Sequence, residues 1–156
     1  MSNNNTKVLV LFGSSTGNTE ELAKTVAQVA KSKGLVVDLI NVAEVSNLNY
    51  AEYDFLFLGT STWDEGQTQL DFRFYLEDLQ ANPPQLNGKQ FAVFGTGESC
   101  YQYFCGGTEK LAQTFASFGG TRVGEILKID TLEEDPVDNP KVKTWATEIM
   151  DKWLLS

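Results

Sequence analysis

The first group of residues that could do chemistry is the stretch VLVLFGSSTGNTEEL, residues 8–22. An apolar run ends at Gly13, small hydroxyl, amide and glycine residues follow, and a segment with helical periodicity begins. The stretch contains no lysine or arginine. Backbone N–H groups at a helix N-terminus bind anions with the help of the helix dipole, and hydroxyl groups add further donors. The pattern predicts a phosphate site whose side-chain donors are Ser14, Ser15, Thr16, Asn18 and Thr19.

Other interpretations of this loop explain less of it. GSSTG, residues 13–17, matches the nucleophile elbow of hydrolases, but the chain has no histidine with which to complete a catalytic triad. The lysine that follows the last glycine of a nucleotide-triphosphate loop is absent. A capping box formed by Asn18 and Glu21 is the purely structural alternative, and it leaves the hydroxyl residues before Gly17 unexplained.

Two further loops carry aromatic residues. GTSTWDEGQTQ places Trp63 between polar residues, where burial in a core is hard to arrange. GTGESCYQYFCGG brings Tyr101, Tyr103 and Phe104 to one place, and it lacks the last glycine of the dinucleotide fingerprint. Aromatic residues in two loops beside a phosphate site suggest a flat ring held between two side chains. Core packing is a weak alternative for Trp63 and Tyr101 and a strong one for Phe104, and the role of Tyr103 stays open.

The cysteines do not suggest a metal site. Cys100 and Cys105 are not at zinc-ligand spacing, and no histidine can complete a ligand set. We expect two reduced thiols, with a structural disulfide as the alternative. Any chemistry must therefore come from carboxylates, hydroxyls, backbone groups or a bound cofactor.

These loops need a scaffold, and 156 residues suit a single domain. Short apolar runs alternate with longer segments of helical periodicity, which predicts a parallel sheet, buried on both faces, with helices on each side. Ligands of such sheets bind beyond the carboxyl ends of the strands, so the loops after the first, third and fourth strands should form the site. The expected strands are residues 8–12, 35–42, 55–59, 91–95 and 123–129, and the expected helices are residues 19–34, 70–80, 107–118 and 140–154.

Between the second and third strands, residues 43–54 predict one or two short turns and no full helix. Residues 1–6 are expected to be a flexible lead, because MSNNNTK is polar and lacks the apolar core of a signal peptide. The apolar runs are too short to span a bilayer. We therefore expect residues 7–156 to form one cytoplasmic domain.

The charge is lopsided, with 12 basic and 21 acidic residues and a net charge of −9. Nucleic acids and anionic membranes need a positive patch, so neither is an expected partner. An acidic surface serves either solubility or attraction to a basic partner, and the total charge does not separate the two.

Taken together, FGSSTGNTE, STWDEG and FGTGESCYQYFCG resemble, in order and separation, the three cofactor loops of a flavodoxin. The similarity runs from about Val8 to the end of the chain, and no long insertion interrupts GTRVGEILKID, which is typical of the short-chain type. The resemblance implies an α/β three-layer sandwich: a five-stranded parallel sheet of order 2-1-3-4-5 with helices on both faces. It also implies non-covalently bound flavin mononucleotide, FMN.

The resemblance assigns roles to particular positions. Residues 14–19 would hold the phosphate, Ser61 and Thr62 would line the phosphate and ribityl region, Trp63 and Tyr101 would stack on the flavin, and residues 98–105 would line its pyrimidine edge. No catalytic residue and no metal are implied. The full implied set is Ser14, Ser15, Thr16, Gly17, Asn18, Thr19, Ser61, Thr62, Trp63, Asp64, Glu65, Gly66, Thr96, Gly97, Glu98, Tyr101, Tyr103, Phe104 and Cys105.

One position departs from the family. Many flavodoxins carry glycine after the tryptophan, where a peptide flips to hydrogen-bond flavin N5 on one-electron reduction, and this chain has Asp64. A turn that needs positive φ costs a residue with a Cβ atom about 1 kcal/mol. The sequence therefore predicts a less stabilised neutral semiquinone than in a glycine-bearing relative.

The function implied is that of a low-potential one-electron carrier that uses the semiquinone/hydroquinone couple of FMN and is not itself an enzyme. Its expected partners are redox proteins with basic docking surfaces, such as a ferredoxin/flavodoxin-NADP reductase and low-potential acceptor enzymes, and it is expected to be a monomer. The alternative is an FMN-dependent NAD(P)H quinone reductase on the same fold. A phosphoacceptor signalling domain would need an aspartate where Gly59-Thr60-Ser61 stand, and the final helix without a linker disfavours a fragment of a multidomain reductase.

Overall fold

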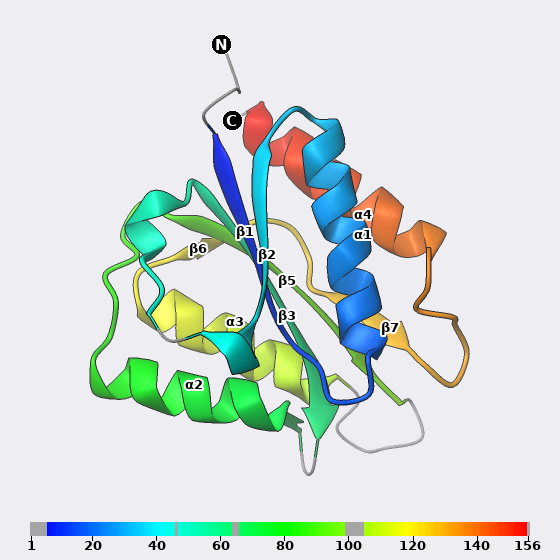
Figure 1. The fold of residues 1–156 in the computed structure, drawn as a ribbon, viewed down its shortest axis with the longest axis horizontal. Helices are drawn as coiled ribbons and strands as arrows, with labels where there is room; N and C mark the ends of the chain where they lie inside the picture. The colour runs from blue at the N-terminus through cyan, green and yellow to red at the C-terminus, as the bar shows by residue number, and fades with distance from the viewer. Residues whose placement is uncertain (1–5, 46, 64–65, 99–104, 156) are drawn as a thin grey trace.

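The computed structural model describes residues 6–45, 47–63, 66–98 and 105–155. The chain forms one sheet with helices on both of its faces (Figure 1). The strands are β1 Lys7–Gly13, β2 Val36–Asn41, β3 Phe55–Trp63, β4 Gln67–Thr68, β5 Gln90–Gly97, β6 Thr121–Arg122 and β7 Leu127–Asp130. The helices are α1 Asn18–Ser32, α2 Leu70–Ala81, α3 Gly106–Ser117 and α4 Pro140–Leu154, with short 3-10 turns η1 Val42–Glu44 and η2 Tyr50–Glu52.

The sheet confirms the predicted parallel α/β fold. Its main path runs β2-β1-β3-β5-β6, with β7 also paired to β5 and β4 paired antiparallel to β3. Leaving out the two-residue β4, and treating β6 and β7 as two parts of one edge strand, gives the expected order 2-1-3-4-5. The two short turns η1 and η2 take the place of a helix between β2 and β3, as residues 43–54 predicted.

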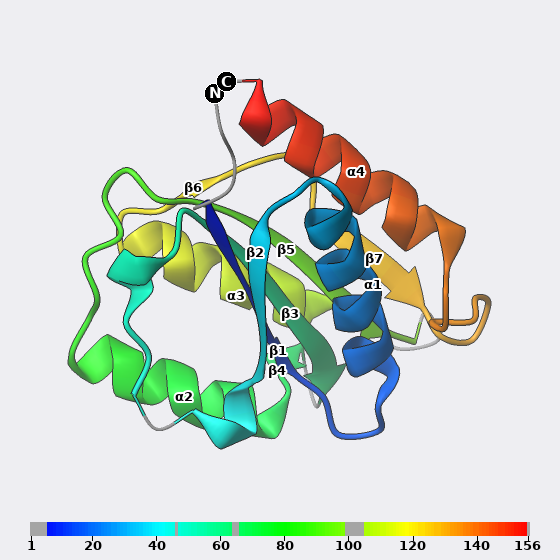
Figure 2. The same ribbon diagram turned by 45° about the horizontal axis from the view of Figure 1, so that its top comes forward.

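The central strands are apolar on both faces, and their alternate residues feed two separate cores. On β1, Val8 and Val10 face one core, which α1 and α4 cover. Leu9 and Leu11 face the other, which is closed by α2 and α3 (Figure 2). Since both faces of β1 are buried, this strand must lie in the interior of the sheet.

The four helices predicted from apolar periodicity are confirmed. Leu22, Val26 and Ala30 of α1, four residues apart, are fully buried, and Val29 packs against the same core. In α4, Val142 and Ile149 are buried in the same core. Asn139 caps α4 by accepting the N–H of Lys141 at 2.8 Å, ahead of the proline at the first helical position.

Two strand predictions were wrong in detail. The fifth strand was expected as one run over residues 123–129, but it is divided into β6 and β7, because residues 123–126 bulge opposite only Ala92 and Val93 of β5. Trp145 of α4 holds the bulge by donating its indole N–H to the carbonyl of Glu125 at 2.9 Å. The second strand was expected to be buried on both faces, but β2 is an edge strand with Val36 and Leu39 exposed.

Among the described residues, no helix combines the length and apolarity needed to cross a membrane.

Candidate functional site

The loop after β1 lies at the carboxyl edge of the sheet and enters α1 through Gly17 (lower part of Figure 1). Gly17 has a φ of 93°, in the left-handed region, and is the N-cap residue of α1. Among the described residues no side chain caps this helix, so the structural alternative, a capping box formed by Asn18 and Glu21, is wrong. Gly17 lacks a Cβ atom and therefore adopts this left-handed conformation without strain, and α1 begins directly after it. Glu21, in place of a capping role, pairs with Lys24 at 3.4 Å. The first N–H groups of α1 are therefore left without an intrahelical or side-chain acceptor.

The hydroxyl residues of this loop have different surroundings. Ser15 and Thr16 are exposed, and Ser14 accepts a hydrogen bond from the N–H of Gly17 at 3.0 Å. Thr19 is fully buried, and its hydroxyl lies 2.9 Å from the hydroxyl of Thr96 on β5. The side chain of Thr19 thus ties α1 to β5.

The loop after β3 is a tight antiparallel hairpin that the sequence did not predict. Thr62 pairs with Thr68 and Trp63 with Gln67, and Gly66 in the turn has a φ of 81°. The hydroxyl of Thr62 accepts the N–H of Gly107 at 3.0 Å and so satisfies one of the first donors of α3. Asp64 and Glu65 lie outside the described residues, and of Trp63 the structure gives only the backbone.

Gln69 is the residue that sequence reasoning missed. It is 2% exposed, caps α2 and donates a side-chain hydrogen bond to Ser15 in the β1 loop at 3.0 Å. Its backbone N–H donates to the hydroxyl of Thr60 at 2.9 Å. No local pattern indicated that Gln69 caps α2 or that it contacts Ser15, 54 residues earlier.

After β5, the described part of the third loop consists of Gly97, Glu98 and Cys105. The carbonyl of Gly97 accepts the N–H of Thr131 at 2.9 Å, which joins this loop to the end of β7. Cys105 is fully buried with a φ of 53°, and it is a free thiol. Burial raises the pKa of Cys105 to about 12, against the lowering effect of the Lys128 ammonium. The remaining loop positions named above, Cys100, Tyr101, Tyr103 and Phe104, lie outside the described residues.

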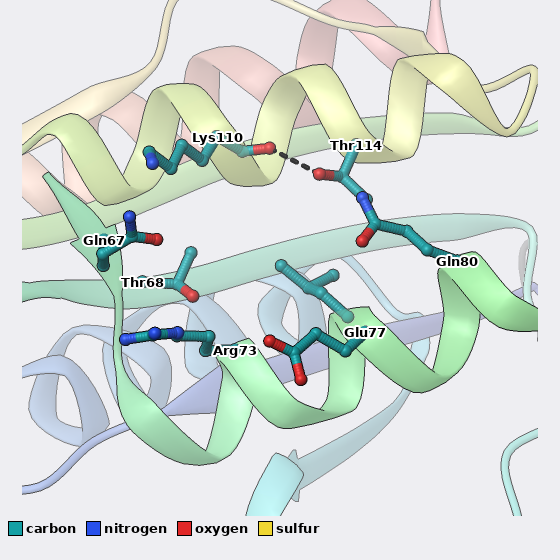
Figure 3. Close-up of a pocket in the computed structure, with 8 residues that line it drawn as sticks. Gln67, Thr68, Arg73, Glu77, Gln80, Lys110 and Thr114 are labelled. Atoms are coloured by element: carbon teal, nitrogen blue, oxygen red, sulfur yellow. Dashed lines mark hydrogen bonds between the residues drawn. The ribbon is translucent and has the colours of Figure 1, made fainter.

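A hollow of about 170 Å³ lies on the flank of the molecule, between α2 and α3 (Figure 3). Arg73 and Glu77 of α2 face Lys110 of α3 across it, and Gln67 lies at its edge. It contains none of the residues of the β1 loop, and it meets the β3 loop at Gln67 and Thr68.

The carboxyl edge therefore brings together the loops after β1, β3 and β5. Its donors are helix N–H groups and hydroxyls, and no basic residue lies in residues 8–22. The described residues include no group of three or more histidine, cysteine, aspartate or glutamate side chains able to hold a metal ion. A donor set of this kind suits an oxyanion that is held by hydrogen bonds rather than by cations.

Comparison with known proteins identifies this arrangement. The family model described as Flavodoxin matches residues 10–149. The chain belongs to the flavodoxin family. Flavodoxins are electron-transfer flavoproteins, and their cofactor is FMN. A flavodoxin of Maridesulfovibrio salexigens is 38% identical over 148 residues, covering 94% of this chain and 98% of that protein.

Solved flavodoxins share the architecture. The structure of oxidised flavodoxin 1 from Bacillus cereus superposes with a TM-score of 0.84 at 28% identity, covering 94% of this chain and 98% of that one. The Fusobacterium nucleatum flavodoxin bound to flavin mononucleotide has the same fold, with a TM-score of 0.76 at 19% identity over 94% of this chain and 98% of that one. The family resemblance read from the three loop motifs is thus confirmed.

The donor set of the β1 loop fits the FMN phosphate. Gly17 has open space where a Cβ atom would lie, and the uncapped N-terminus of α1 follows it directly. A phosphate monoester carries oxygen acceptors and negative charge, which match free N–H donors and the positive end of the helix dipole.

Proposed function

We propose that this chain is a low-potential one-electron carrier that binds FMN non-covalently and shuttles electrons between redox proteins. FMN supplies the redox chemistry, because its ring accepts and releases electrons one at a time. The observation that carries the proposal is the uncapped N-terminus of α1 behind the left-handed Gly17, at the same edge as the β3 and β5 loops. The protein binds the cofactor, orients it and adjusts the free energy of its charged states.

The residues that we assign to the phosphate offer two kinds of donor, backbone N–H groups and side-chain hydroxyls. We assign the backbone N–H groups of Asn18 and Thr19 and the hydroxyls of Ser14, Ser15 and Thr16 to the phosphate oxygens. The hydroxyl of Thr19 also bonds to that of Thr96, and it can donate to the phosphate as well when Thr96 is the donor of that hydrogen bond. The charge of the phosphate is balanced by about half a positive charge from the helix dipole, because the loop provides no cation.

The ring-binding assignments rest on the family. We assign Trp63 and Tyr101 to the two faces of the flavin, Ser61 and Thr62 to the ribityl side, and residues 98–105 to the pyrimidine edge. Two hydrogen bonds fix described residues of the loops that carry these positions. Thr62 is fixed on the N–H of Gly107, and the carbonyl of Gly97 is fixed by Thr131.

The acidic composition accounts for a low potential. The chain carries a net charge of −9, and reduction of FMN adds further negative charge at this edge. One unit charge ~10 Å from the flavin, at an effective dielectric constant of ~20, costs roughly 1.7 kcal/mol, or about 70 mV for one electron. Asp64, Glu65, Asp71 and Glu98 are the candidate charges, so a few of them lower the potential well below that of free FMN.

Partners are proposed to be redox proteins with basic docking surfaces. On α2, Leu70 and Phe74 are 53% and 56% exposed, one turn apart and close in sequence to the β3–β4 hairpin. Exposed acids on the same helix, Asp71, Glu77 and Asp78, surround this apolar pair. A partner with a basic rim complements this face, and such encounters are weak and sensitive to salt. We further propose a cytoplasmic monomer of one domain.

The test is purification with ample riboflavin followed by anaerobic potentiometric reduction. We expect one FMN per chain, strong quenching of added FMN fluorescence, and a final one-electron potential well below that of free FMN. Oxidation of NADPH should require a separate reductase. A colourless protein that leaves FMN fluorescence intact would overturn the proposal, and rapid NADPH oxidation with quinone by the protein alone would favour the reductase alternative.

A further inference from the structure

Every polar group of Gln69 has a partner, and its side chain reaches the phosphate loop. The amide oxygen Oε1 accepts the N–H of Phe72 at 3.1 Å. The amide nitrogen Nε2 donates to Oγ of Ser15 at 3.0 Å and to Oδ2 of Asp71 at 2.9 Å. The side chain is 2% exposed and is packed against β1, since a Cβ atom added at Gly13 would lie 2.6 Å from Oε1.

The partners of Gln69 fix the direction of each hydrogen bond. The N–H of Phe72 can only donate, so the amide oxygen must face it. The carboxylate of Asp71 can only accept, so the amide nitrogen must face it. The second amide hydrogen then points at Ser15, whose hydroxyl oxygen is left with the role of acceptor.

This arrangement leaves the hydrogen of Ser15 unused within the protein. Ser15 is exposed, and its hydroxyl hydrogen has no acceptor among the described residues. The neighbouring Ser14 is arranged in the same way, because its oxygen accepts the N–H of Gly17 at 3.0 Å. A hydroxyl that accepts a hydrogen bond is polarised and becomes a better donor. Both serines therefore offer an O–H donor to a ligand, because their oxygens already accept hydrogen bonds from the protein.

We propose that Gln69, held by Asp71, is a positioning residue of the phosphate site. Its amide N–H donates to the oxygen of Ser15, so that the O–H of Ser15 is directed to a phosphate oxygen of FMN. The inference rests on the proposed function, because it requires the β1 loop to be where the phosphate binds. It explains how a loop without lysine or arginine presents an all-donor surface to an anion.

The test uses two probes that differ only in the phosphate, FMN and riboflavin. In Gln69→Glu the oxygen that caps the helix is kept, but a carboxylate oxygen replaces the amide nitrogen, so it accepts the hydrogen of Ser15 and repels the carboxylate of Asp71. We expect FMN affinity to fall roughly 10- to 100-fold, as for the loss of one hydrogen bond to a charged group, while riboflavin affinity stays unchanged. Gln80→Glu adds the same charge near the other end of α2, where the side chain lines the hollow between α2 and α3, and it should leave both affinities near wild type.

A double-mutant cycle separates positioning from a merely structural role. Ser15→Ala should weaken FMN binding in the wild-type background and have little further effect in the Gln69→Glu background, because there the hydrogen of Ser15 is already committed. Fully additive losses, or an equal loss of FMN and riboflavin affinity, would overturn the positioning role. A wild-type protein that binds neither probe would overturn the proposed function instead.

Asp71→Ala provides a second route if Gln69→Glu does not fold. Removal of a negative charge near an anion site should raise FMN affinity if charge alone matters. The positioning role predicts the opposite sign, because Gln69 loses the acceptor that holds its amide, so FMN affinity should fall by less than in Gln69→Glu. A rise in FMN affinity in Asp71→Ala would contradict the inference.

Discussion

Gly17→Ala tests the central geometric feature of the site. Gly17 has a φ of 93° and nothing within 4 Å of the position that a Cβ atom would occupy. The substitution therefore adds backbone strain without a steric clash. An L side chain in the left-handed region costs roughly 1–2 kcal/mol, and the restricted unfolded chain returns roughly 0.4–1 kcal/mol. We expect a net loss of about 1 kcal/mol in the free energy of unfolding.

The effect on FMN should be larger than the effect on stability. If the backbone relieves the strain by leaving the left-handed region, the N–H groups of Asn18 and Thr19 turn away from the phosphate. Each hydrogen bond to a charged group contributes about 1.5–3 kcal/mol, which corresponds to roughly a 10- to 150-fold rise in the dissociation constant. The assay is dilution of the holoprotein, in which released FMN is followed by its fluorescence, together with urea unfolding.

Gly34→Ala is the matched control. Gly34 has a φ of 83°, also has nothing within 4 Å of a Cβ position, and follows the other end of α1. It should lose about the same stability as Gly17→Ala, since the strain is of the same kind, and keep wild-type affinity for FMN. Equal FMN affinity in the two variants would refute the assignment of the phosphate to the N-terminus of α1.

Three more outcomes follow from the described contacts and from the sequence. Thr19→Val leaves the hydroxyl of the buried Thr96 without its partner at 2.9 Å and should lower the free energy of unfolding, measured in urea, by about 1–3 kcal/mol. Adding Thr96→Val should restore part of this loss, and strictly additive losses would argue against the pairing. Cys105 has a pKa raised from 9.0 to about 12, so the unfolded chain binds fewer protons between these values and stability must fall as pH rises through that range. Unfolding measured from pH 8 to 11 should show a shallower decline in Cys105→Ala, and an unchanged slope would contradict the assignment. Asp64→Gly should change the separation of the two one-electron potentials of bound FMN in favour of the singly reduced state, because glycine accepts positive φ at little cost; unchanged potentials would sink that expectation.

Local sequence was sufficient for the elements and for the kind of site. Helical periodicity over residues 19–34 predicted α1, and the apolar runs predicted the central strands. Motifs in three loops indicated the family, because the chemistry of a phosphate loop lies in residues adjacent in the chain. These features depend on neighbours within a few positions, which a single sequence displays directly.

Tertiary structure decided the features that join distant segments. The sequence indicated Thr19 as a phosphate ligand, and only the structure shows that its hydroxyl also bonds to Thr96, 77 residues later. Gln69 had no role predicted from the sequence, yet its amide sets the direction of the hydroxyl of Ser15, 54 residues earlier. The partner of a hydrogen bond is fixed by where the strands place each loop. The direction of that hydrogen bond depends on all the partners of both groups at once. Neither the partner nor the direction can therefore be deduced from a local sequence pattern.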